Sequence, residues 1–379
     1  MKFNLKLKTS HIPKEGVLLL ALPLLLLLSF CTRQEIDQEV SIIEITRVGG
    51  VTVNQEGDQL SEIMGDLVVS DSLEMVYGVD LRVMKAYQLS LETGDVMYLA
   101  PEGRGPAELN VPIQITKKAE DILLIFDNGL DVIAEYYDGF IQKKYPGLSE
   151  HKVWVRNLKG FYHEGNIISG IVEPVKVRNM DFENARPLAF LNYKSGNMIR
   201  KGDFSPTVDN LDSDNKYPVI YFDEELNRVF YVFLNDYTVM AYDLDKDTTT
   251  ALDSFRPTEF RTKSLAVQGS TMGNISAAMA LGLDVTFVQG IDRVGDHLIV
   301  VWFNYKEGFY ENMGDFSDGN VDYFGVIYDL PNMENPLEFT LPGRFFGVYK
   351  NKLLIEEEYG SMDLKIGFYE LDLTLPAVL

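Results

Sequence analysis

Apolar and polar positions along this chain follow a unit that recurs six times, most often at intervals of about 50 residues. In each unit an apolar stretch with an aromatic residue runs into a polar turn. The six copies are centred on Tyr87, Tyr137, Phe190, Tyr242, Tyr328 and Tyr369. A period of this length is typical of propeller blades, in which each repeat is a small sheet that covers the apolar face of its neighbour.

Each copy is preceded by a more apolar run, as expected for a strand buried on both faces. These runs are residues 73–79, 121–126, 167–172, 229–234, 297–303 and 353–355. Each copy is followed by a short stretch that reaches a proline, at positions 101, 146, 206, 257, 342 and 376. Proline cannot donate to a strand ladder, so this third stretch predicts an edge strand.

An innermost strand is expected before each apolar run. The candidates are residues 65–70, 111–117, 153–162, 217–223, 283–291 and 345–350. The sequence therefore predicts an all-β, six-bladed propeller with four-stranded antiparallel blades over residues 40–379. Residues 40–53 either add a strand to the last blade or cover an edge. One helical insertion is expected within residues 258–282, where Asn274 caps a run of helix formers that ends near Gly282.

Residues 1–30 have the composition of a secretion signal. Four lysines lie in the first 14 residues, and residues 17–30 form an apolar run of 14 residues. A spanning helix needs roughly 18 or more apolar residues, and Pro23 interrupts this run, so it predicts a cleaved leader. The run ends at Cys31, which resembles the lipid-attachment cysteine of bacterial lipoproteins, although Phe30 replaces the usual small residue. Residues 31–39 are expected to form a lipidated tether.

Charge and composition exclude several classes of function. The formal net charge is −23, so nucleic-acid binding is not expected, because phosphate contacts need clustered lysine and arginine. Cys31 is the only cysteine, which excludes an intramolecular disulfide and leaves no thiolate for zinc once it carries lipid. Asp243, Asp245 and Asp247 begin like a calcium loop, but Ser254 stands where that loop needs glutamate, so a hairpin turn is predicted.

Catalytic signatures are missing from the sequence. Residues 269–273 come nearest to a serine-nucleophile motif, but Thr271 occupies the central position. With 57 acidic residues, spacing alone cannot single out an acid–base pair. Neither a dinucleotide fingerprint nor a phosphate-binding glycine loop occurs in the sequence. We therefore assign no catalytic residue, metal or cofactor.

Residues 100–115 read APEGRGPAELNVPIQI, and this segment resembles the GRGPGE signature of TolB-like six-bladed β-propeller lipoproteins, common in Bacteroidetes. Ala107 stands where that family usually has glycine. The resemblance implies the same fold and a location in the cell envelope. In physical terms the glycines at 103 and 105 allow a tight turn, so the segment is expected to link the first two blades.

Antiparallel pairing places four unusual connections at one rim of the channel: residues 103–108, 173–186, 258–282 and 304–320. Loops at a channel mouth commonly carry binding residues. The ligand-binding candidates are Arg104, Glu108, Tyr305, Phe309, Tyr310 and Phe316. Rings among polar neighbours suit sugar or peptide recognition, and the alternative is that they pack onto neighbouring blades.

These observations predict a lipid-anchored binding module in the cell envelope, tethered to the outer membrane through Cys31 on either its periplasmic or its surface side. Its ligand would be a peptide, a glycan or a partner protein. The alternative is a carbohydrate-active lyase or hydrolase that uses carboxylates at the channel mouth. An enzyme predicts an inward-facing cluster with perturbed pKa values, whereas a binding module predicts an aromatic or apolar rim. A third interpretation is a structural component of an envelope complex.

Overall fold

Strands form all the regular secondary structure in the part of the chain that the structure describes. The computed structural model describes residues 43–54, 60, 67–147, 154–155, 159–172, 186–207, 217–253, 255–261, 285–306, 320–357 and 364–373. All of these belong to the second of two units, residues 1–40 and 41–379. Within the described ranges, no helix has the length and apolar character to cross a membrane. The predicted helix near Asn274 lies outside the described residues.

Three sheets contain four strands each, consecutive in sequence and antiparallel. The first contains β2 (Val68–Ser70), β3 (Met75–Asp80), β4 (Lys85–Ser90) and β5 (Val96–Tyr98). Another contains β15 (Pro218–Asp223), β16 (Arg228–Phe233), β17 (Val239–Asp243) and β18 (Thr248–Asp253). The next contains β19 (Thr286–Val294), β20 (His297–Tyr305), β21 (Val321–Asp329) and β22 (Glu334–Leu341).

A nine-stranded sheet contains two further antiparallel runs of four strands. One run is β6 (Pro112–Ala119), β7 (Ile122–Asp127), β8 (Val132–Tyr137) and β9 (Phe140–Pro146). The other is β11 (Lys159–His163), β12 (Asn166–Val172), β13 (Leu188–Asn192) and β14 (Met198–Lys201), with β10 (Trp154–Val155) paired to β12. The runs join where β6 and β11 pair in parallel, Ile115 opposite Lys159 and Lys117 opposite Phe161.

The last sheet combines the two ends of the second unit. Strands β23 (Arg344–Tyr349), β24 (Lys352–Glu357) and β25 (Lys365–Leu371) are followed at the outer position by β1 (Ile45–Thr52). Strand β1 therefore adds a strand, which settles the choice that the sequence left open. A strand leading to Pro376 is not found among the described residues, which end at Leu373, because β1 already occupies the outer edge of β25.

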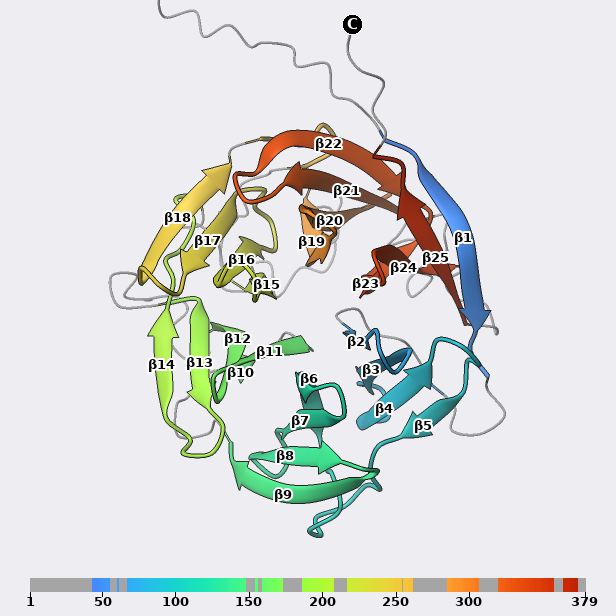
Figure 1. Cartoon of the computed structure of the whole chain (residues 1–379), viewed down its shortest axis with the longest axis vertical. Coiled ribbons are helices and arrows are strands. Elements are labelled where there is room, and N and C mark those ends of the chain that lie inside the picture. Colours follow the sequence, from blue (N-terminus) through green and yellow to red (C-terminus); the bar gives the residue numbers. More distant parts are fainter. Residues whose placement is uncertain are drawn as a thin grey trace, which may run out of the picture. The chain divides into compact units, whose positions relative to one another are not determined.

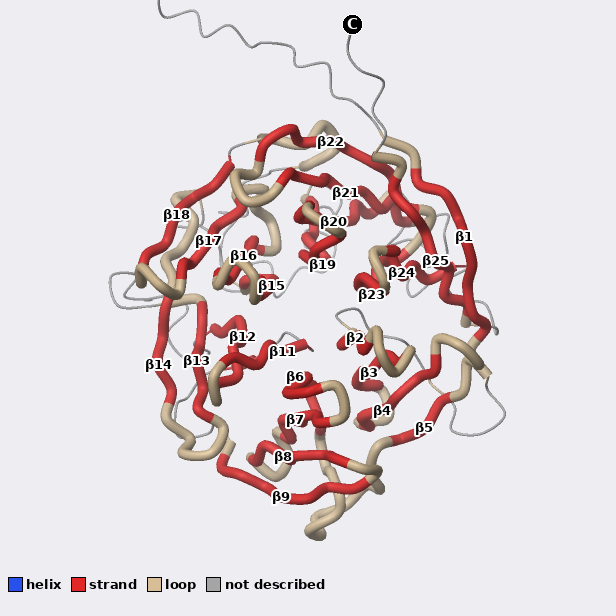
Figure 2. The backbone as a smooth tube through the Cα atoms, in the orientation of Figure 1, coloured by secondary structure: helices blue, strands red, loops and turns tan. Residues whose placement is uncertain are grey.

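The sheets surround a central axis in a propeller arrangement (Figures 1 and 2). Strands β2, β6, β11, β15, β19 and β23 lie nearest the centre, and β1, β5, β9, β14, β18 and β22 form the perimeter. Apolar clusters fill the spaces between neighbouring sheets, as with Phe230 of β16 and Trp302 of β20, both almost fully buried. The predicted all-β propeller arrangement is confirmed.

Polar contacts also join neighbouring sheets at the turns. In the turn between β6 and β7, Glu120 Oε2 accepts hydrogen bonds from the hydroxyls of Ser70 and Ser72, each at 2.6 Å, and Oε1 accepts one from Lys117 Nζ at 3.0 Å. Partial burial acts to raise the pKa of Glu120, but these three donors outweigh it and lower the pKa to about 2. The carboxylate therefore stays charged and holds the first two sheets together.

Candidate functional site

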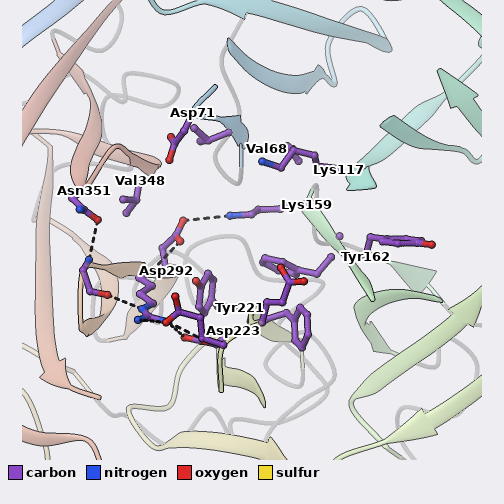
Figure 3. Close-up of a pocket in the computed structure, with 18 of the residues that line it drawn as sticks. Val68, Asp71, Lys117, Lys159, Tyr162, Tyr221, Asp223, Asp292, Val348 and Asn351 are labelled. Atoms are coloured by element: carbon purple, nitrogen blue, oxygen red, sulfur yellow. Dashed lines mark hydrogen bonds and ion pairs between the residues drawn. The ribbon is translucent and has the colours of Figure 1, made fainter. Parts of the chain in front are cut away.

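A cavity of about 670 Å³ opens at the centre of the ring, where the innermost strands end; we call it the channel pocket (Figure 3). Every innermost strand contributes a lining residue, from Val68 of β2 to Val348 of β23. The polar and aromatic lining includes Asp71, Lys117, Lys159, Phe161, Tyr162, Tyr221, Asp223, Asp292, Arg293 and Asn351. A cavity of this size holds a small molecule or one end of a chain.

The strand pattern explains why charges lie there. Strand β15 reads PVIYFD and β19 reads TFVQGIDRV, so each is apolar for most of its length and becomes charged near its end. The charged residues lie at the channel mouth, where Asp223 and Asp292 are themselves buried. They can remain ionised because each has a cationic partner, while the rest of the strand packs between neighbouring sheets.

Arg293 gathers several carboxylates on one side of the channel pocket. Its Nη1 lies 3.0 Å from Asp223 Oδ2, its Nη2 lies 2.7 Å from Glu225 Oε2, and its Nε donates to the carbonyl of Gly295 at 2.6 Å. The Asp223 side chain is fully buried and also accepts a hydrogen bond from the backbone N–H of Leu226. Burial acts to lower the pKa of Arg293, but Glu225 and Asp223 outweigh it, so the pKa is raised and the guanidinium stays charged.

Lys159 reaches across the pocket from β11 to Asp292 on β19, and Figure 3 draws this ion pair as a dashed line. Its Nζ lies 3.3 Å from Asp292 Oδ2 and 5.0 Å from the centre of the Phe161 ring. The two partners come from sheets that are separated in the chain by the β15–β18 sheet. Asp292 is thus paired with the ammonium group of Lys159, which lies on the opposite wall of the channel.

Aromatic rings complete the wall. Phe161 and Tyr221 meet edge to face, with ring centres 5.7 Å apart, and Tyr162 lines the same cavity. Burial, aided by the nearby charges of Asp292 and Asp223, raises the pKa of Tyr221, so its hydroxyl stays protonated at neutral pH. Rings beside fixed charges and a hydroxyl can hold an apolar body with polar ends.

The pKa shifts resolved in this pocket move away from neutrality, for both Arg293 and Tyr221. A general acid or base works best when its pKa is near the working pH, so these two groups suit binding better than proton transfer. Among the described residues, no group of three or more histidine, cysteine or acidic side chains could hold a metal ion. The pocket therefore offers fixed charges, hydrogen bonds and ring faces.

The predicted residue Glu108 turns inward and stabilises its own loop. Its Oε2 accepts a hydrogen bond from the Gly105 N–H at 2.6 Å, and Lys144 Nζ donates to the carbonyls of Gly105 and Glu108 at 2.7 and 2.6 Å. A Cβ at Gly103, where φ is +156°, would lie 2.0 Å from Glu108 Oε2, so a larger residue here would strain the backbone and displace the Glu108 carboxylate. These contacts support the linker role, while Arg104 lies exposed on the same loop.

Tyr305, at the end of β20, packs against other rings. Its ring centre is 5.5 Å from that of Phe287 and 5.3 Å from that of Phe303. Its carbonyl accepts a hydrogen bond from Arg261 Nη1 at 2.9 Å, which joins the beginnings of two of the four unusual connections. Phe309, Tyr310, Phe316 and Cys31 lie outside the described residues. Ligand binding by the six candidates stays a prediction.

The channel pocket lies at the end of the innermost strands opposite to Arg104, Glu108 and Tyr305. Arg104 and Glu108 precede β6, whereas Lys117 lines the pocket near the end of that strand. At about 3.3 Å per residue, β6 separates the two positions by roughly 20 Å. The signal that could have located the pocket was the recurrence of charge at the ends of the innermost strands, as in Lys117, Asp223 and Asp292.

Comparison with known proteins supports the fold. No family model matches this chain, and no curated protein matches it. Among solved structures, a member of the DUF4221 family from Bacteroides vulgatus superposes with a TM-score of 0.67 at 13% identity, covering 88% of this chain and 99% of that one. A Bacteroides fragilis protein described as exported superposes with a TM-score of 0.56 at 11% identity, covering 87% and 95%. At such identities the likeness shows the fold alone.

Proposed function

We propose that this protein is an exported, lipid-anchored six-bladed β-propeller that binds a peptide, a glycan or a partner protein. The observation that carries the proposal is the channel pocket, which draws lining residues from all the innermost strands and combines fixed charges with ring faces. Loops and turns around a propeller axis commonly form binding sites, because the scaffold holds them rigidly at one place.

The count of six blades is supported by the strand pairing. Six sets of four strands follow one another around the ring, if the nine-stranded sheet is taken as two blades. The parallel contact of β6 with β11 is what two adjacent innermost strands would make near the axis. The sixth set is completed by β1, so the first strand after the tether would close the ring.

Binding is better supported than catalysis by the two buried carboxylates of the pocket. Asp223 is held by Arg293 and Asp292 by Lys159, so each already has a cationic partner. A hydrolase or lyase would instead need one carboxylate free to accept a proton.

A pocket-filling substitution tests the binding role. We expect Val348→Trp, which puts an indole into the cavity, to weaken binding of whichever peptide or glycan the wild-type protein retains on arrays by more than about tenfold. Glu334→Gln, an exposed change on β22, is the control and should bind like wild type. If Val348→Trp bound the same ligand as tightly as the wild type, with an unchanged melting temperature, the result would contradict a binding site in the channel pocket.

The anchor is tested separately at Cys31, which follows the apolar leader. We expect Cys31→Ala to move the protein from the membrane fraction to the soluble envelope fraction, because two acyl chains bind a bilayer firmly and the rest of the tether is polar apart from Ile36. Cell fractionation with immunoblotting measures this. A Cys31→Ala protein that stays with the membrane would rule out the lipid as the anchor.

A further inference from the structure

We propose that the channel pocket continues outward into a second cavity, and that the two form one track for an extended, positively charged peptide. This inference rests on the proposed binding function and specifies its ligand. The second cavity, called here the side groove, has a volume of about 640 Å³ and lies between the β11–β14 strands and the β15–β18 sheet. Its lining residues are His163, Glu164, Asn166, Phe190, Ile199, Lys201, Glu224, Asn227, Tyr242, Leu244, Asp245 and Asp247.

The two cavities meet at two places in the chain. On β11, Phe161 and Tyr162 line the channel pocket, and the next residue, His163, lines the side groove. In the turn after β15, Glu224 lines both cavities. His163 also packs against Phe222, with ring centres 4.9 Å apart, so the two walls approach each other at this junction. A ligand would therefore pass from one cavity to the other over Glu224, the exposed residue that lines both.

Charge selects the class of ligand. Nine carboxylate side chains line the two cavities, against four lysine or arginine side chains. Carboxylates only accept hydrogen bonds, whereas the charged ends of lysine and arginine only donate them. An anionic chain would be repelled along this track, and a neutral glycan would leave the excess carboxylates without a charged partner. A peptide with several basic side chains matches the lining.

The inner end of the track already holds an ammonium that belongs to the protein. Lys159 Nζ lies between the Asp292 carboxylate, at 3.3 Å, and the face of Phe161, at 5.0 Å from the ring centre. Carboxylate and ring face are together the contacts that a ligand ammonium would seek. Because lysine has a long flexible stem, Lys159 can move away from Asp292 and Phe161. A basic side chain of the peptide would then occupy the position between these two residues.

The outer end of the track suits the stems of basic side chains. Ile199 of β14 is 61% exposed and Phe190 lines the same groove, so apolar surface lies beside carboxylates there. Asp245 is exposed and accepts a hydrogen bond from Asn227 Nδ2 at 2.7 Å. A lysine or arginine side chain can lay its methylene stem on the apolar surface and its charge against Asp245.

The test uses a fluorescein-labelled nonapeptide of alternating lysine and serine, measured by fluorescence anisotropy with the full-length protein at about 150 mM salt. We expect Asp292→Asn and Asp245→Asn each to weaken binding about fivefold or more, and Glu334→Gln, which removes the same charge elsewhere, to change it less than about twofold. Lys159→Met should tighten binding because it vacates Asp292. Lys352→Met should not, because this lysine is paired with Glu370 between β24 and β25 and is not among the lining residues of either cavity.

Each contrary result is distinct. Equal effects of Lys159→Met and Lys352→Met would mean that only overall charge attracts the peptide, which overturns the proposal. An effect of Asp292→Asn without one of Asp245→Asn would confine the ligand to the channel pocket and overturn the track. Failure of the basic peptide to bind, while a glutamate–serine peptide or a neutral hexasaccharide binds and Val348→Trp blocks it, would overturn the peptide but leave the binding function standing.

Discussion

Removal of β1 should abolish the closed ring and, with it, most of the stability of the folded unit. We expect a chain that lacks residues 41–53 to lose its cooperative unfolding transition or to melt more than about 10 °C lower. Strand β1 pairs with β25 from Ile45 opposite Leu371 to Thr52 opposite Lys365, and the buried residues Ile43 and Val53 flank it. Each buried aliphatic side chain is worth about 1.5–3 kcal/mol, and a whole domain is stable by only about 5–15 kcal/mol.

Polar contacts also hold β1 against β24 and β25. Arg47 donates to both oxygens of Glu357, at 2.6 and 3.0 Å, and Tyr369 donates to the same carboxylate at 2.5 Å. Loss of β1 would leave Glu357, which is mostly buried, without its arginine, and would expose the ladder edge of β25.

Differential scanning calorimetry measures the loss, and a chain that lacks only residues 32–39 is the control. That deletion should leave the melting temperature unchanged. Addition of a synthetic peptide covering residues 43–54 should restore the transition, because the peptide can pair with the vacant edge of β25. A β1 deletion that melts like wild type would mean that the pairing of β1 with β25 contributes little to the stability of the folded unit.

Strand positions were accessible to sequence reasoning because burial on two faces leaves continuous apolar runs. The runs predicted at 121–126 and 229–234 coincide closely with β7 and β16. Ring closure was not accessible, since residues 40–53 carry an apolar pattern that fits an added strand or a cover equally well. The choice depends on the pairing of Arg47 and Thr52 with residues more than 300 positions away, and no local pattern encodes such a partner.

The candidate site was harder to predict. Aromatic residues between polar neighbours drew attention to Tyr305, whose ring packs against Phe287 and Phe303. The channel pocket, in contrast, is built from single charged residues, such as Lys159 and Asp292, that lie 133 positions apart. In the sequence each is an ordinary charge near a strand end. Only the radial arrangement of the sheets brings these two residues together at the mouth of the channel. Their role in the pocket therefore depends on the tertiary fold.

Arg293→Ala should be among the most destabilising single substitutions in the described part of the chain. The Asp223 side chain is fully buried, and Arg293, itself only 19% exposed, is its charged partner, with the two oxygens at 3.2 and 3.0 Å from Nη1. Removing one partner of a buried pair leaves an uncompensated charge, which costs about 3–5 kcal/mol. We expect a loss of that size in the free energy of unfolding, measured by urea denaturation.

Two companion variants separate this effect from loss of packing. Asp223→Asn added to Arg293→Ala removes the buried charge and should recover about half of the lost free energy, because the amide oxygen can still accept from the Leu226 N–H. Arg228→Ala breaks a more exposed pair, 3.4 Å from Asp243, and should cost about 1 kcal/mol or less. If the double variant were no more stable than Arg293→Ala, the buried charge of Asp223 would not be the cause. The guanidinium would then act through packing at the pocket mouth, where it also contacts Glu225 and the Gly295 carbonyl.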